Sequence, residues 1–167
     1  MKSISILKKL INIYYYLLVL ILVAGALSFP LLFFKKKYEV KFIGYLIDLN
    51  SLNYVNVCII FILIITLWGL YFLAIKRLRK SVQDLSTGHY FSQLVVTNFK
   101  KSGILFLISG AGEFIAKIIL SVILKNEFKL SLDTSTILFV IMGLFLMFLS
   151  EVFQKARELK QENDLTI

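Results

Sequence analysis

The sequence has one cysteine, one proline and one histidine, and its 10 acidic residues are far outnumbered by 19 Lys and Arg. A lone cysteine, Cys58, excludes an intramolecular disulfide, and we expect it to be a small buried apolar side chain. A lone histidine, His89, lacks the partners that a metal site or histidine-based catalysis needs. We therefore expect no catalytic, cofactor or metal site, and a protein that is not an enzyme.

Apolar residues are what the chain has in excess, at 59% of the sequence. Soluble domains contain about 45–50%, so the excess points to lipid as the surrounding medium. The formal net charge is +9, and the basic residues stand at the ends of the apolar runs, which is typical of membrane proteins. No reading helix or aromatic stacking platform accompanies them, so we expect no direct nucleic-acid binding.

Four apolar runs are long enough to cross a bilayer core of about 30 Å. They predict transmembrane helices over about 10–34, 55–77, 102–124 and 134–154, in a single domain spanning 1–167. Because the runs are continuous, a barrel of alternating strands is excluded, and the expected fold is an all-α antiparallel bundle. A signal peptide cleaved near residues 24–26 is the alternative for the first run, whose length favours an uncleaved helix.

The distribution of Lys and Arg predicts the orientation, since the short inner segments of a multi-pass protein are enriched in both. With the N-terminus inside, the inner segments hold about twice as many as the outer ones. We therefore expect a protein of the inner (cytoplasmic) membrane with both termini in the cytoplasm. Four basic residues at the inner end of the second helix are expected to contact anionic inner-leaflet lipids: Lys76, Arg77, Arg79 and Lys80.

The segments outside the apolar runs also carry patterns. Apolar residues recur at i, i+4 and i+7 as Leu78-Val82-Leu85 and as Val152-Ala156-Leu159, which predicts that helices 2 and 4 continue into the cytoplasm. Ser92 is a candidate N-cap for a helix from Gln93. In the first outer loop, residues 38–42 alternate and Gly44 permits a turn, which allows a small β-hairpin; an irregular amphipathic loop is the alternative.

The most distinctive candidate site is a pair of charges, Glu113 and Lys117, within the third run. Their i, i+4 spacing with the acid first favours an ion pair on one helix. A charge deep in a bilayer is costly, so such residues are by default candidates for function, here a proton or ion relay or a ligand contact. The alternative is a structural pair that satisfies itself. Small residues beside the pair, Gly110, Gly112 and Ala116, indicate close helix packing.

The end of the chain, Glu151 to Ile167, with the inner segment from Gly88 to Gly103, resembles a bacterial four-span membrane family of unknown function, domain of unknown function 2975. The most specific part is the final Glu-Asn-Asp-Leu-Thr-Ile after an amphipathic turn. The residues that carry the resemblance are Glu158, Leu159, Glu162, Asp164, Leu165 and Thr166. The resemblance implies no catalytic residues, but it implies a helix-turn-helix regulator encoded nearby.

Two functions remain open from the sequence. The first is a non-enzymatic regulatory or interaction component, suggested by the two amphipathic inner extensions and the absence of a catalytic set. We expect these stripes to pack on each other or on a cytoplasmic partner. The second is a small proton- or ion-coupled transporter that uses Glu113. The sequence does not indicate a substrate, a partner's identity or an oligomeric state.

Overall fold

The computed structural model describes residues 2–28, 39–48 and 51–165. In these ranges the chain forms α1 (Lys2–Ser28), β1 (Glu39–Phe42), β2 (Tyr45–Asp48), α2 (Tyr54–Ser86), α3 (Gln93–Lys125) and α4 (Thr134–Leu165). All four helices are long and apolar enough to cross a membrane. The predicted all-α fold with four spanning helices is therefore confirmed, and it supports a multi-pass membrane protein.

Most helices extend beyond the predicted spans. Helix α2 continues to Ser86 and α4 to Leu165, so the helical continuation indicated by their apolar stripes is confirmed. Helix α3 begins at Gln93 rather than near residue 102, which leaves only residues 87–92 as a connection, here called the elbow. Helix α1 begins at Lys2 and is described to Ser28; the predicted continuation over residues 29–34 lies outside the described residues.

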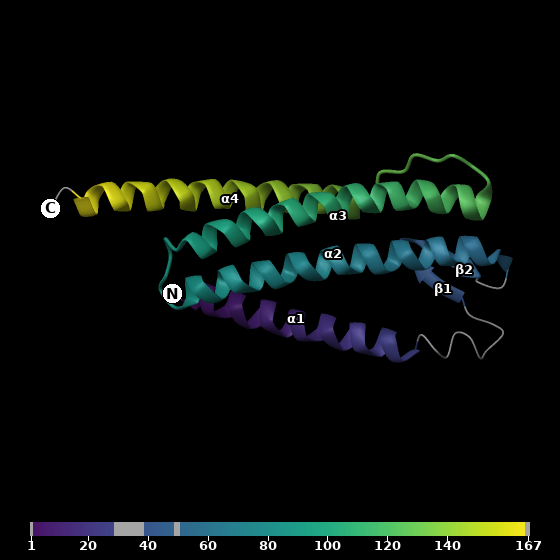
Figure 1. The fold of residues 1–167 in the computed structure, drawn as a ribbon, viewed down its shortest axis with the longest axis horizontal. Coiled ribbons are helices and arrows are strands. Elements are labelled where there is room, and N and C mark those ends of the chain that lie inside the picture. Colours follow the sequence, from purple (N-terminus) through teal and green to yellow (C-terminus); the bar gives the residue numbers. More distant parts are fainter. Residues whose placement is uncertain (1, 29–38, 49–50, 166–167) are drawn as a thin grey trace.

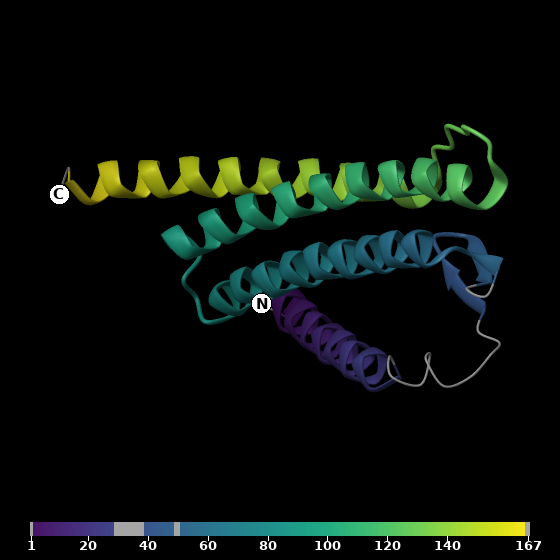
Figure 2. The same cartoon turned by 45° about the vertical axis from the view of Figure 1, so that its right-hand side comes forward.

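The helices run antiparallel in an open row (Figure 1). One end, the elbow end, holds the start of α1, the elbow and the last turns of α4, and the opposite hairpin end holds β1, β2 and the α3–α4 loop. Helix α3 contacts both α2 and α4 extensively, whereas α1 contacts mainly α2. Figure 2 shows α1 diverging from α2 toward the hairpin end. Helix α1 is therefore the least packed of the four, and the α3–α4 contact is the most extensive.

Local chemistry explains where α2 ends and α3 begins. Gly88 has φ +90°, a conformation that glycine adopts without steric cost and that terminates the helix. The Ser92 hydroxyl accepts a hydrogen bond from the Val95 amide at 3.2 Å, as the predicted N-cap should. The same hydroxyl donates to Asp84 at 2.8 Å, so the cap also ties the new helix to α2.

The two predicted apolar stripes differ in how far they are buried in the core near the elbow end. Val82 and Leu85 are buried, and Leu78 packs against the cluster of α1, α2, α3 and α4 side chains that contains Leu85. In contrast, Val152 and Leu159 are 47% and 56% exposed. The stripe of α2 thus faces the protein, while the stripe of α4 is open, so the two are not used in the same way.

The predicted hairpin is present in the described part of the first loop. Strands β1 and β2 pair antiparallel, with Val40 opposite Ile47, and Ile43 and Gly44 both have positive φ at the turn. Ile47 is completely buried in a cluster with Ile60 of α2 and Leu120 of α3. An isolated hairpin is only marginally stable, and this packing supplies the anchor that it needs.

The prediction that Cys58 is buried is wrong, because its side chain is exposed on α2. An apolar run indicates a buried residue only where water is the solvent. In a spanning helix, one apolar face packs on neighbours and another can face lipid. The sequence pattern around Cys58 does not distinguish these two faces.

Candidate functional site

The two predicted charges, Glu113 and Lys117, lie on α3 at the hairpin-end half of the molecule. Lys117 Nζ is 2.8 Å from Glu113 Oε1, so the residues form the i, i+4 ion pair that their spacing indicates. Lys117 is 1% exposed and Glu113 is 8% exposed. Both charges are therefore shielded by the protein.

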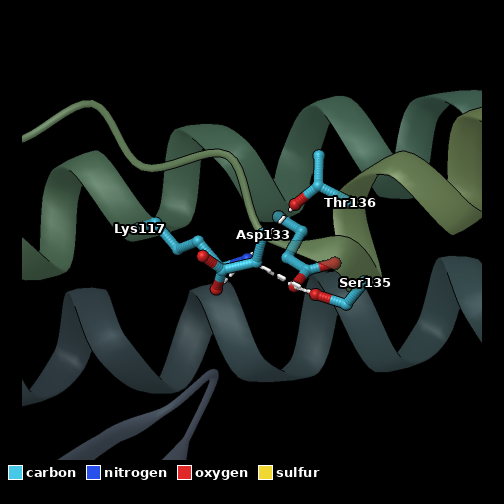
Figure 3. Close-up of polar contacts among 5 residues, drawn as sticks. Lys117, Asp133, Ser135 and Thr136 are labelled. Atoms are coloured by element: carbon cyan, nitrogen blue, oxygen red, sulfur yellow. Dashed lines mark hydrogen bonds and ion pairs between the residues drawn. The ribbon is translucent and has the colours of Figure 1, made fainter.

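The site also contains residues that sequence reasoning missed. Lys117 Nζ lies 2.9 Å from Asp133 Oδ2, which makes a second ion pair, and it donates to the Thr136 hydroxyl at 3.2 Å. The Ser135 hydroxyl donates to Glu113 Oε1 at 2.6 Å. Figure 3 shows these side chains gathered where α3 faces the start of α4. The pair is thus part of a charge cluster between two helices, here defined as Glu113, Lys117, Asp133, Ser135 and Thr136.

The cluster forms because α4 begins beside α3 well before the end of that helix. Lys117 lies about 12 Å before the end of α3, at 1.5 Å per residue, and the chain folds back over residues 126–132 before α4 starts at Thr134 (Figure 1). Asn126 reverses the chain with φ 56°, and the Asp133 carbonyl accepts the first hydrogen bond of α4 from Ile137. The only signal in the sequence was an acidic residue directly before the fourth helix.

Glu113 uses one of its carboxylate oxygens for all its described partners. Both Lys117 and Ser135 contact Oε1. Within the described residues, Oε2 is the buried side-chain oxygen or nitrogen that has no hydrogen-bond partner. Leaving a buried acceptor unsatisfied costs about 1–3 kcal/mol, and more for a charged group. This bare oxygen is therefore an unusual feature of the fold.

A cavity of about 160 Å³ lies beside Glu113. Helix α2 contributes Leu67, Trp68 and Tyr71 to its wall, α3 contributes Ser109 and Glu113, and α4 contributes Phe139; the hairpin adds Phe42 and Ile43. The Ser109 hydroxyl donates to the Leu105 carbonyl, and the Tyr71 hydroxyl is hydrogen-bonded to that of Tyr14. The wall is thus apolar and aromatic, with one carboxylate in it.

The predicted small residues lie at close contacts on two sides of α3. A Cβ added to Gly110 would lie 3.1 Å from Phe139 Cβ of α4, and one added to Gly112 would lie 2.8 Å from Leu67 Cδ2 of α2. Ala116 is completely buried. A tighter approach occurs where Gly103 of α3 meets Gly143 of α4, since a Cβ at Gly103 would lie 2.7 Å from the Gly143 oxygen. That glycine pair was not among the small residues predicted from the sequence.

The four basic residues at the elbow end of α2 divide into two kinds. Arg79 donates to Asn12 at 2.7 Å and to the Tyr16 hydroxyl at 3.2 Å, so it joins α2 to α1. Arg77 is half-buried and donates to Asn98 at 3.4 Å. Lys76 and Lys80 are exposed. Two of the four side chains are thus engaged within the protein.

The C-terminal residues that carry the family resemblance lie on the last turns of α4. Leu159, Glu162 and Asp164 are exposed, and Glu158, also exposed, accepts a hydrogen bond from Gln154 at 3.1 Å. Leu165 ends the helix, and Thr166 lies outside the described residues. Earlier in the tail, Phe153 stacks on Phe99 and Arg157 donates to Gln93. One flank of the tail is therefore docked on α3, while Leu159 remains open.

In residues 2–28, 39–48 and 51–165, no group of three or more His, Cys, Asp or Glu could hold a metal ion.

Comparison with known proteins identifies a family. The family model described as "Protein of unknown function (DUF2975)" matches residues 4–167. No curated protein and no solved structure matches the chain.

Proposed function

Because the chain belongs to the DUF2975 family, whose function is unknown, we propose from its own residues that it is a non-enzymatic regulatory or interaction component of the inner membrane. The observation that carries the proposal is the continuity of α4. This helix begins at the charge cluster and ends, without a break, in the exposed stripe of Val152 and Leu159. It can therefore couple events near the hairpin end to a partner at the elbow end.

The coupling relies on the rigidity of α4 and on how its first turn is held. A helix of 32 residues is about 48 Å long at 1.5 Å per residue. Lys117 holds Asp133 and Thr136 at its start. A change in the cluster that releases these contacts would shift or tilt α4 as a unit, and interfaces packed this closely move between discrete arrangements. The far end of the helix would then present Leu159 differently.

The partner we propose for that stripe is a cytoplasmic protein, with both termini of the chain on the cytoplasmic side. The helix-turn-helix regulator implied by the family resemblance is the first candidate. An apolar stripe flanked by Arg157, Glu158 and Lys160 fits the groove of a helical protein, which such helices bind through residues spaced at i and i+7. Exposed Lys76 and Lys80 are proposed to contact anionic lipid headgroups beside this tail.

A proton- or ion-coupled pathway through Glu113 is the second candidate, and the bare Oε2 is the observation that favours it. Such a pathway needs polar groups or water on both sides of the carboxylate. Toward the elbow end, Gly103 and Gly143 bring α3 and α4 into backbone contact, and Ser102 and Ser150 donate to backbone carbonyls. This closed packing supports the regulatory proposal over transport.

Photocrosslinking tests the proposal in cells. A photoreactive amino acid at Leu159 should capture a cytoplasmic protein, which mass spectrometry identifies. Gln161 is the matched control, because it is also exposed but lies on about the opposite side of a helix with 3.6 residues per turn. Capture of the same protein from both positions, or of lipid alone from Leu159, would contradict the proposal. Flux that depends on Glu113 in reconstituted vesicles would favour transport instead.

A further inference from the structure

We propose that the cavity beside Glu113 binds a small organic monocation of the substituted-ammonium class. The Glu113 carboxylate in the wall would balance its positive charge, and the rings of Trp68, Tyr71 and Phe139 would contact its alkyl groups. This inference goes beyond the proposed function and does not depend on what the tail of α4 contacts.

The charge cluster has more negative than positive groups. Glu113 and Asp133 bring two negative charges against the single positive charge of Lys117, so the group carries a net charge of about −1 when all three are ionised. An ammonium has three donors, and those of Lys117 have Glu113 Oε1, Asp133 Oδ2 and Thr136 Oγ1 as partners within 3.2 Å. Lys117 therefore has no donor left over for Oε2.

A hard metal ion does not fit this wall as well as an organic cation does. Hard metal ions such as Ca²⁺ and Mg²⁺ need about six oxygen ligands, whereas this wall offers few oxygens among apolar and aromatic groups. A diffuse cation that needs few hydrogen bonds matches the lining better.

The aromatic wall and the volume of the cavity suit an organic cation. Ring faces attract organic cations, and aromatic cages for quaternary ammonium groups work in this way. The cavity volume of about 160 Å³ is below the roughly 300–1,000 Å³ of sites for drug-sized ligands. The site therefore suits a group of the size of trimethylammonium, either as a free solute or as the headgroup of a lipid.

Fluorescence can test the proposal because Trp68 is the only tryptophan in the chain. The full-length protein in maltoside micelles is titrated with choline and with 3,3-dimethylbutan-1-ol, which has the same shape without the charge. Choline should change the Trp68 emission saturably, and the neutral compound should bind at least about tenfold more weakly. Equal affinity for the two compounds, or no saturable change with choline, would overturn the proposal.

Variants then locate the binding site. Glu113→Gln should weaken choline binding by about tenfold or more, and Phe139→Leu should weaken it by a smaller factor. Glu127→Gln, which removes an exposed carboxylate outside the cavity, should leave it unchanged. Unaltered binding by a folded Glu113→Gln variant would refute the assignment. If that variant does not fold, the comparison of charged and neutral probes on the natural chain decides alone.

Two further arms separate the sources of the cation. In nanodiscs made only of phosphatidylglycerol, free choline should bind as it does in micelles. If phosphatidylethanolamine in the nanodiscs competes with choline, a lipid headgroup occupies the site; if it does not, the ligand is a free solute. Binding of choline with normal affinity in a variant that no longer crosslinks through Leu159 would show that the cavity functions apart from the tail.

Discussion

Lys117 Nζ lies 2.9 Å from Asp133 Oδ2, and this contact joins the body of α3 to the residue directly before α4. The helices are thereby tied close to the point where Gly110 of α3 approaches Thr136 and Phe139 in the first turns of α4. Lys117 forms ion pairs with two carboxylates, while its own side chain is almost fully buried. The stability of the hairpin-end half should therefore depend on this one cation.

Replacing Lys117 by methionine should destabilise the fold strongly. The substitution keeps the length of the side chain but leaves Glu113 as a buried charge without its counter-ion, at a cost of about 3–5 kcal/mol. Asp133→Asn should cost only about 0–1 kcal/mol, because its side chain is 53% exposed. Thermal unfolding in detergent, followed by circular dichroism, would measure both. A Lys117→Met variant as stable as the natural chain would contradict this description of the cluster.

Gly103→Ala should loosen the α3–α4 contact. Its Cβ would lie 2.7 Å from the Gly143 oxygen and from Met147 Cγ, and overpacking of this kind costs about 1–3 kcal/mol. Gly69→Ala is the control, since nothing lies within 4 Å of its added Cβ and alanine favours a helix over glycine by about 1 kcal/mol. The two variants should therefore shift the unfolding temperature in opposite directions. Equal shifts would show that the glycine contact is not tight.

Arg79→Lys should release α1 from α2. The guanidinium contacts Asn12 and the Tyr16 hydroxyl, and its carbon lies 4.4 Å from the centre of the Tyr15 ring. A lysine ammonium cannot reproduce this planar set of donors. Hydrogen exchange should accelerate in α1 and not in α3 or α4. Lys80→Gln, at an exposed neighbour, should leave exchange in α1 as it was, and a similar effect from both variants would argue against a specific role for Arg79.

The proposed orientation predicts which cysteines an impermeant reagent can reach. In a Cys58→Ser background, a cysteine at Lys129, in the α3–α4 loop, should be labelled by a charged maleimide in intact spheroplasts. A cysteine at Gln161, on the tail of α4, should be labelled only after permeabilisation. The opposite pattern would reverse the orientation and would remove the cytoplasmic partner from the proposed function.

Short-range features of this chain were predictable because they depend on spacing along one element. The i, i+4 order of Glu113 and Lys117, the N-cap at Ser92 and the turn at Gly44 each involve residues close in sequence. The physical rules for helix faces, caps and turns apply to such groups directly. The lengths of the apolar runs predicted four spanning helices for the same reason.

Features that depend on the axial offset between helices were not predictable. Asp133 reaches Lys117 only because α4 starts beside α3 about 12 Å before the end of that helix, and the same offset places Gly103 against Gly143. Sequence spacing contains no measure of how far the loop after Asn126 folds back. The cavity has a similar origin, since it combines side chains from three helices and a hairpin turn whose anchor, Ile47, was not foreseen as buried.

The open row has a consequence for biosynthesis. Contacts join helices that follow each other along the chain, so each helix after the first finds a neighbour already in place when it leaves the ribosome and enters the bilayer. Partners this near in sequence pair quickly, because little chain entropy is lost in bringing them together. Assembly can thus proceed stepwise during translation, and the earliest helix need not wait for the latest one before it docks.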